Sequence, residues 1–218
     1  MSVVFIKELE RGVFLGVWKF DENADSVNVN LPYRLPSASR SICESRQREV
    51  ISVYSLVGMM TGKTDFIIGH HPSGRPYLEG YHIGISHTKQ YASVILSKTK
   101  KVSVDIEYQS DRIVRIANRF LRDDEKKMFV DGNAAEGQSR SIFSGSPDYT
   151  PLLLSWCAKE TMFKYYSDAR LTFEYMRVSG LSRVASSGIF YCENLLTAER
   201  RIVSYEVNSR FCLTYMIG

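Results

Sequence analysis

The chain has 218 residues, of which 44% are hydrophobic and 24% charged, a composition typical of a globular protein that buries a sizeable core. Its formal net charge of +4 falls short of a nucleic-acid-binding signature and favours phosphorylated ligands or acidic protein partners. Four scattered cysteines predict neither a zinc site nor a disulfide framework, and nothing indicates a membrane span or signal peptide. We therefore expect a cytoplasmic monomer that binds neither nucleic acid nor membrane.

The first half of the chain predicts an opening hairpin, a long helix and a group of strands. Period-two alternation between turn residues indicates the strands, and apolar spacing of three and four indicates the helix. The predicted strands cover 3–6, 13–20, 66–68, 82–86, 91–97 and 102–107, the predicted helix covers 39–60, and 21–39 is predicted to be a loop.

After a polar junction near residue 100, the second half of the chain again predicts a combination of helices and strands. We expect helices over 111–121 and 152–166, a short helix that begins at Asp123 or Asp124, and an exposed loop over 131–151. The predicted strands cover 173–178, 188–192, 201–207 and 211–216. The fold class is therefore α+β, with two similar subdomains over residues 1–100 and 101–218.

A buried strand that ends in two carboxylates is the first candidate site. In the segment K-V-S-V-D-I-E-Y, alternation puts Asp105 and Glu107 on one face, with Cα atoms about 6.5 to 7 Å apart. Two carboxylates this close can share a divalent cation. The alternative is an ordinary strand with a solvated polar face.

A second candidate lies in the segment W-C-A-K-E-T-M-F-K, residues 156–164. Helical spacing of four aligns Trp156, Glu160 and Lys164, with Lys159 on an adjacent line. This arrangement adds a third carboxylate with two cations beside it. The alternative is a Lys-Glu surface pair next to a buried tryptophan.

Five short motifs in one order resemble the 4′-phosphopantetheinyl transferases of the surfactin-synthetase-activating type. The motifs are G-R-P-Y-L from Gly74, G-I-S-H from Gly84, D-I-E from Asp105, R-F-L-x-x-x-E from Arg119 and W-C-A-K-E-x-x-x-K from Trp156. The resemblance implies two α+β subdomains related by a pseudo-twofold axis, with coenzyme A between them. It also implies transfer of the 4′-phosphopantetheine group from coenzyme A to a serine of an apo acyl or peptidyl carrier protein, with release of 3′,5′-ADP.

The resemblance assigns roles to several of these side chains. Asp105, Glu107 and Glu160 would hold Mg²⁺, or alternatively Mn²⁺. Glu125 would be the general base, and Lys164, with Lys159, would neutralise charge on the departing phosphate. For Glu125 the alternative is a carboxylate that only stabilises the first turn of a helix.

Coenzyme A would be bound mainly by the first half of the chain. The implied contacts there are Arg46, Arg48, Arg75, Pro76, Ser86 and His87, and those in the second half are Lys159 and Lys164. The alternative for Arg46 and Arg48 is that they only form a solvated helix face. The alternative for the G-R-P segment is that it is only a tight turn between strands.

Two other classes of function remain open. The first is a non-catalytic protein of the same fold that binds coenzyme A or a carrier protein. The second is a metal-dependent phosphodiesterase or nuclease, because carboxylate clusters serve those enzymes too.

Overall fold

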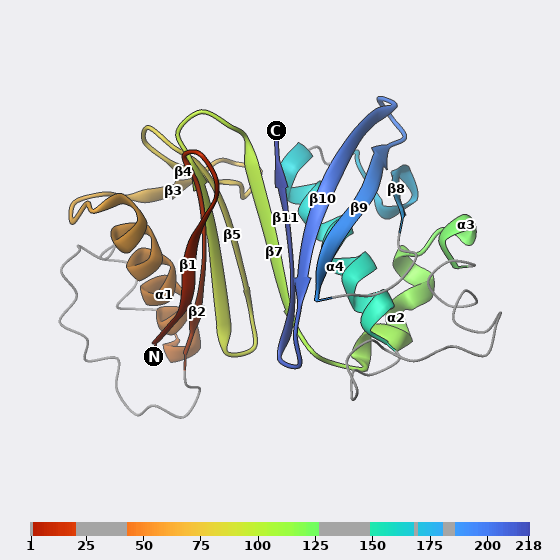
Figure 1. The fold of residues 1–218 in the computed structure, drawn as a ribbon, viewed down its shortest axis with the longest axis horizontal. Coiled ribbons are helices and arrows are strands. Elements are labelled where there is room, and N and C mark those ends of the chain that lie inside the picture. Colours follow the sequence, from red (N-terminus) through yellow and green to blue (C-terminus); the bar gives the residue numbers. More distant parts are fainter. Residues whose placement is uncertain (1, 21–42, 127–148, 168–169, 181–185) are drawn as a thin grey trace. The chain divides into compact units, whose positions relative to one another are not determined.

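The computed structural model describes residues 2–20, 43–126, 149–167, 170–180 and 186–218. The predicted loop over 21–39 and nearly all of the one over 131–151 lie outside these residues. The chain forms two compact units, the first comprising Met1–Ile106 with Gly218 and the second Glu107–Ile217 (Figure 1). The described part is α+β, with three sheets.

The boundary falls between Ile106 and Glu107 rather than between residues 100 and 101. Strand β7 (Val102–Tyr108) begins in the first unit and ends in the second. The first five residues of β7 belong to the first unit because they pack against residues 82–88 of that unit's sheet, as the contacts of Asp105 show below.

The first unit is an antiparallel sheet covered by one helix. Its strands lie in the order β1-β2-β6-β5, with bounds Ser2–Glu10, Val13–Lys19, Tyr91–Ser97 and His82–Thr88. Helix α1 (Glu44–Thr61) packs on β2 and β6. A separate two-stranded sheet pairs β3 (Ile68–His70) with β4 (Pro76–Leu78).

Strand β6 is buried along its whole length because both of its faces are covered. Ala92, Val94 and Leu96 join the core formed with α1. Ile95 points the other way, toward Gly84 of β5 and the backbone of β7. A strand covered on both faces needs a continuous run of apolar and small residues, which matches Y-A-S-V-I-L-S.

The second unit packs three helices against a second antiparallel sheet. Strands β11, β10, β9 and β8 are neighbours in that order, with bounds Phe211–Ile217, Glu199–Val207, Ser187–Asn194 and Met176–Ser179. The helices are α2 (Arg112–Phe120), α3 (Asp123–Lys126) and α4 (Thr150–Tyr166). None of the helices in the described residues has the length and apolarity needed to cross a membrane.

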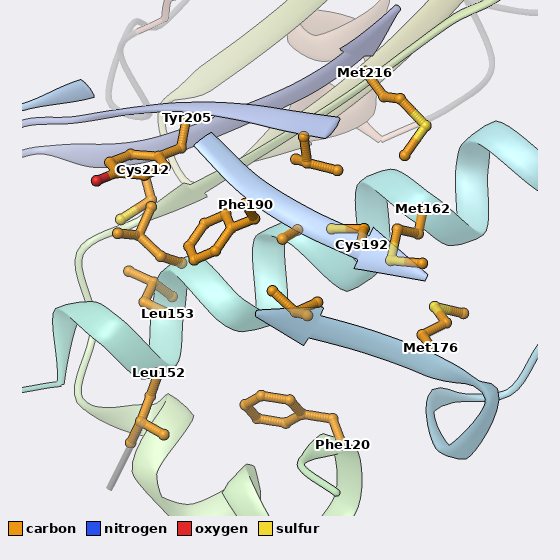
Figure 2. Close-up of a cluster of buried hydrophobic side chains, with 14 of the residues drawn as sticks. Phe120, Leu152, Leu153, Met162, Met176, Phe190, Cys192, Tyr205, Cys212 and Met216 are labelled. Carbon is orange, nitrogen blue, oxygen red and sulfur yellow. The ribbon is translucent and has the colours of Figure 1, made fainter. Parts of the chain in front are cut away.

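The core of this unit joins α2 and α4 to the sheet. Figure 2 shows Phe120, Leu153 and Met162 facing Phe190 and Met216. Cys192 and Cys212 belong to the same core, and burial raises the pKa of both thiols above the ordinary value. These thiols therefore stay protonated and unreactive in the folded protein.

Several predicted boundaries differ from the structure. The strand predicted over 66–68 occurs as β3 (Ile68–His70), and strand β4, which includes Pro76, was not predicted. Residues Phe173–Tyr175 form a 3₁₀ turn, η3, so that the strand expected from 173 begins at Met176. Helix α4 starts at Thr150 because Pro151 occupies its first turn, where proline is well tolerated.

Gly84 provides a test of the packing between β5 and β7. A Cβ atom there would lie 2.8 Å from Ile95 Cγ2 and 3.0 Å from Ser103 Cα, and backbone cannot move aside as a side chain can. We expect Gly84→Ala to lower the free energy of unfolding by about 1 to 3 kcal/mol, measured by urea denaturation.

Gly16→Ala is the matched control, in the same sheet. Its added methyl group would meet the flexible ends of Met60 and Leu56, which can rotate away. The loss should be less than half of that for Gly84→Ala, and equal losses would contradict the proposed role of backbone contact.

Candidate functional site

Asp105 is a buried carboxylate held by a serine from a different motif. Ser86 Oγ donates a hydrogen bond to Asp105 Oδ1 over 2.8 Å, and the backbone N–H of Ile106 donates to the same Ser86 oxygen over 3.3 Å. Asp105 is only 3% exposed. At this residue, the alternative of a solvated polar face is therefore wrong.

Gly84 makes this contact possible. Its missing side chain lets β5 approach β7, where a Cβ atom would come within 3.2 Å of the Val104 nitrogen. Ser86, two residues further along β5, lies on the same face as Gly84. The G-I-S-H and D-I-E motifs therefore meet in the first unit.

Glu107 is oriented by Trp156 in the second unit. The indole Nε1 donates a hydrogen bond to Glu107 Oε1 over 3.0 Å. The indole ring is held by Phe120 and Phe173, with ring centroids 5.2 Å and 5.3 Å away. The D-I-E motif is thus linked to W-C-A-K-E as well.

Glu160 and Lys164 follow Trp156 at intervals of four on α4, as helical spacing predicted. Both side chains are half-buried, so each keeps some exposure to solvent. A carboxylate and an ammonium group in this position can contact a ligand.

Lys159 points into the core instead of lying beside this line. Its side chain is fully buried and its Nζ lies 2.5 Å from Oε2 of Glu125, which is 1% exposed. Lys159 Nζ also donates to the backbone carbonyls of Phe120 and Phe173, over 2.7 Å and 3.3 Å. These contacts account for all three of its N–H groups.

The carboxylate oxygens of Glu125 also have hydrogen-bond partners. Besides Lys159 it accepts hydrogen bonds from the backbone N–H of Arg122, over 2.9 Å, and of Val178, over 2.7 Å. Burial lowers the pKa of Lys159 below its ordinary value, and the Glu125 carboxylate opposes that fall. Neither side chain of this buried pair reaches solvent, so contact with a substrate would require the pair to open.

Arg46 and His87 come together through a residue that was not predicted. Arg46 donates to Glu49 Oε2 over 2.6 Å and lies 2.9 Å from His87 Nε2, while His87 Nδ1 lies 3.4 Å from Glu49 Oε1. These partners assign the proton of a neutral imidazole to Nδ1. The i,i+3 spacing of Arg46 and Glu49 was the available sequence signal.

Arg48 lies on a different side of α1. It is 7% exposed and pairs with Glu44 over 3.2 Å. The alternative of a solvated helix face is therefore wrong for Arg48. Its burial makes it a poorer candidate for a phosphate contact than Arg46.

Arg75 and Pro76 line a basic pocket in the first unit. The cavity has a volume of about 300 Å³. Its remaining lining residues are His71, Tyr77, Tyr81, His82, Ile83 and Lys101. The lining contains two permanent cations, two histidines and no carboxylate, together with aromatic rings, so it suits a phosphorylated ligand with a flat ring system.

The three carboxylates predicted to hold a metal are divided between the units. Asp105 lies in the first unit, and Glu107 and Glu160 lie in the second. Within the described ranges, no group of three or more His, Cys, Asp or Glu side chains that could hold a metal ion was found. The metal site therefore stays a prediction.

Comparison with known proteins adds no assignment. No family model matches the chain, and no curated protein matches it.

The buried pair gives a prediction about stability. Glu125→Gln leaves the Lys159 ammonium group without its countercharge, and Lys159→Met leaves the carboxylate without its own. Each substitution should lower the free energy of unfolding by about 3 to 5 kcal/mol. The double substitution should be less destabilising than the sum of the two, as measured by a double-mutant cycle in urea.

Lys126→Met is the control, because it removes an ion pair with Asp123 at the surface. Its unfolding midpoint should match that of the parent. Strictly additive losses for Glu125 and Lys159 would contradict the coupling of the pair.

Proposed function

We propose that the protein is a 4′-phosphopantetheinyl transferase that uses coenzyme A and an apo acyl or peptidyl carrier protein. The observation that carries this proposal is that both acids of D-I-E are oriented by residues of other motifs. Ser86 of G-I-S-H holds Asp105, and Trp156 of W-C-A-K-E holds Glu107. Motifs from three separate parts of the sequence thus converge on one strand.

In the proposed reaction, the hydroxyl oxygen of a carrier serine attacks the pyrophosphate phosphorus nearest the pantetheine. A new P–O bond forms to the serine, the bond to the bridging oxygen breaks, and 3′,5′-ADP leaves. The serine proton passes to a base or to water. Such a reaction depends mainly on positioning and on neutralisation of charge, and Lys164 is the half-buried cation of α4 that would face the departing phosphate.

The three acids fit Mg²⁺ in the chemistry of their donors. Carboxylate oxygens are the ligands that this ion prefers, and ligating carboxylates are commonly held by further hydrogen bonds, as Asp105 and Glu107 are. When bound, Mg²⁺ would neutralise pyrophosphate charge. We propose that Asp105, Glu107 and Glu160 hold it.

The basic pocket of the first unit would take part of coenzyme A. Arg75 and Lys101 supply charge for a phosphate, and the tyrosines supply surface for the base. Arg46 is the second candidate cation. His87 Nε2 accepts a hydrogen bond from Arg46 over 2.9 Å, so this atom does not donate one to an anion.

We propose a positioning role for the buried pair. Lys159 and Trp156 lie on the same helix, and Glu125 joins that helix to β8 through Val178. The pair thereby fixes the part of α4 that carries Trp156, Glu160 and Lys164. General-base catalysis by Glu125 stays a prediction, and it would need the ion pair with Lys159 to open.

Glu107 and Trp156 allow a first test of the metal. With Mg²⁺, coenzyme A and an apo carrier, Glu107→Gln should abolish the gain in carrier mass. Trp156→Phe keeps the aromatic packing but loses the donor to Glu107, so the Mg²⁺ concentration for half-maximal rate should rise about 10- to 100-fold. Saturating Mg²⁺ should restore most of the rate.

Glu174→Gln is the control, since Glu174 is an exposed carboxylate of η3 in the same unit; its rate should equal that of the parent. Full activity of Glu107→Gln, or of chelated protein, would contradict the metal site. Binding of coenzyme A without transfer by the parent would instead favour the non-catalytic alternative.

Arg75 allows a separate test of the pocket. If Arg75 binds the ribose 3′-phosphate, Arg75→Ala removes a charge-assisted hydrogen bond worth about 1.5 to 3 kcal/mol. The KM for coenzyme A should rise about tenfold or more while kcat changes little. Steady-state kinetics should show almost no change in KM for 3′-dephospho-coenzyme A, and equal losses on both substrates would mean that Arg75 only shapes the turn.

A further inference from the structure

Helix α1 and strand β5 bring three polar side chains together in the first unit, and one of them is an acid. Glu49 Oε2 accepts a hydrogen bond from Arg46 Nη1 over 2.6 Å, and Glu49 Oε1 lies 3.4 Å from His87 Nδ1. Arg46 Nη1 and His87 Nε2, 2.9 Å apart, complete the triangle. Each oxygen of the carboxylate therefore faces one of the other two side chains.

The Glu49 carboxylate bridges Arg46 and His87 as a bound anion can. A phosphate group also contacts an arginine and an imidazole N–H through separate oxygens. The side chains of Arg46 and His87 are 48% and 40% exposed, whereas that of Glu49 is 17% exposed. The two side chains that can bind a phosphate are thus open to solvent, and the acid that contacts both is the least exposed of the three.

Glu49 is held less firmly than the buried acid of the second unit. Glu125 accepts two backbone N–H groups in addition to its ion pair with Lys159. The Glu49 carboxylate has only Arg46 and His87 as partners within the described ranges. An ion pair three residues apart on a helix is worth only about 0.2 to 0.5 kcal/mol, so a ligand can displace this carboxylate at small cost.

Arg46 keeps donors that a ligand can use. Both of its contacts involve Nη1, and its Nε and Nη2 groups have no partner in the described part of the chain. The charge of Arg46 is nevertheless cancelled by that of Glu49. Because like charges about 4 Å apart repel by about 1 kcal/mol even in bulk water, a phosphate at Arg46 is opposed for as long as the carboxylate stays there.

We infer that Glu49 is an internal counter-ion that competes with a phosphate group of coenzyme A for Arg46 and His87. The carboxylate withdraws when the phosphate binds, and it pairs with Arg46 again when the ligand leaves. Glu49 thereby limits the affinity of the site. The inference rests on the proposed function, because coenzyme A is the substrate of that function.

The alternative is that Glu49 only positions Arg46 and His87. The two roles predict opposite effects of removing the carboxylate. Loss of a competing counter-ion tightens binding of a phosphate, because Arg46 then meets the ligand without a rival acid. Loss of a positioning residue weakens binding, because both partners then lose their orientation.

Binding can be measured without turnover, by isothermal titration calorimetry of coenzyme A with Mg²⁺ and no carrier protein. Glu49→Gln removes the negative charge and keeps the shape of the side chain, so the Kd should fall about three- to tenfold. Arg46→Gln removes a charge-assisted hydrogen bond to the ligand, so the Kd should rise about tenfold or more. An ion pair that only stabilises the helix would not give shifts of opposite sign.

Glu44→Gln is the matched control, because Glu44 lies on the same helix and also pairs with an arginine, Arg48. It should bind coenzyme A within twofold of the parent. Circular dichroism and the thermal midpoint establish that each variant is folded.

Titration of 3′-dephospho-coenzyme A then identifies the phosphate. If Glu49→Gln tightens binding of both compounds, the competing group is the pyrophosphate. If it tightens binding of coenzyme A alone, the group is the ribose 3′-phosphate. Either result supports the counter-ion.

The outcomes separate this inference from the proposed function. An unchanged or raised Kd for Glu49→Gln, with transfer by the parent, would overturn the counter-ion and leave the transferase intact. Tighter binding by Glu49→Gln without any transfer by the parent would support the counter-ion and count against the transferase. Equal Kd values for the parent and Arg46→Gln, or no binding by the parent and Glu49→Gln, would also overturn the counter-ion.

Discussion

The second unit depends on one buried ion pair, Lys159 with Glu125. The Lys159 ammonium group donates hydrogen bonds to the carbonyl of Phe120, at the end of α2, and to that of Phe173, in η3. The Glu125 carboxylate accepts hydrogen bonds from the backbone N–H groups of Arg122 and Val178. Two side chains thereby satisfy backbone groups in α2, η3 and β8 and in the residue that precedes α3. Removing either charge would leave the other buried and uncompensated, so the pair specifies how α4 sits against η3 and β8.

Much of the fold follows from local patterns in the sequence. Period-two alternation predicted β7, and apolar spacing predicted α2 and most of α4. Local patterns failed where a tertiary contact decides the outcome. Lysine is almost never fully buried unless it is paired, and nothing near Lys159 in sequence reveals that its partner lies 34 residues earlier.

The candidate site was likewise predicted only in part from the sequence. The residue types and their order were readable from the motifs, including Asp105, Glu107 and Trp156. The hydrogen bonds that orient them were not, because Ser86 reaches Asp105 only where Gly84 lets two strands approach. The two helix arginines also lie in different environments, although a single residue separates them. Arg46 lies beside His87, whereas Arg48 is buried and pairs with the exposed Glu44.

The strand order of the first unit has a consequence for synthesis of the chain. Strand β2 pairs with β1 across a tight turn along one edge. Its other edge pairs with β6, where Val13 lies opposite Ser97, and β6 is synthesised much later. Roughly 80 residues separate the end of β2 from the end of β6, so a ribosome that adds 5 to 20 residues per second needs roughly 4 to 16 s to deliver that partner. During this interval the nascent hairpin exposes an unpaired apolar edge, and a chaperone that shields such edges should bind at this stage.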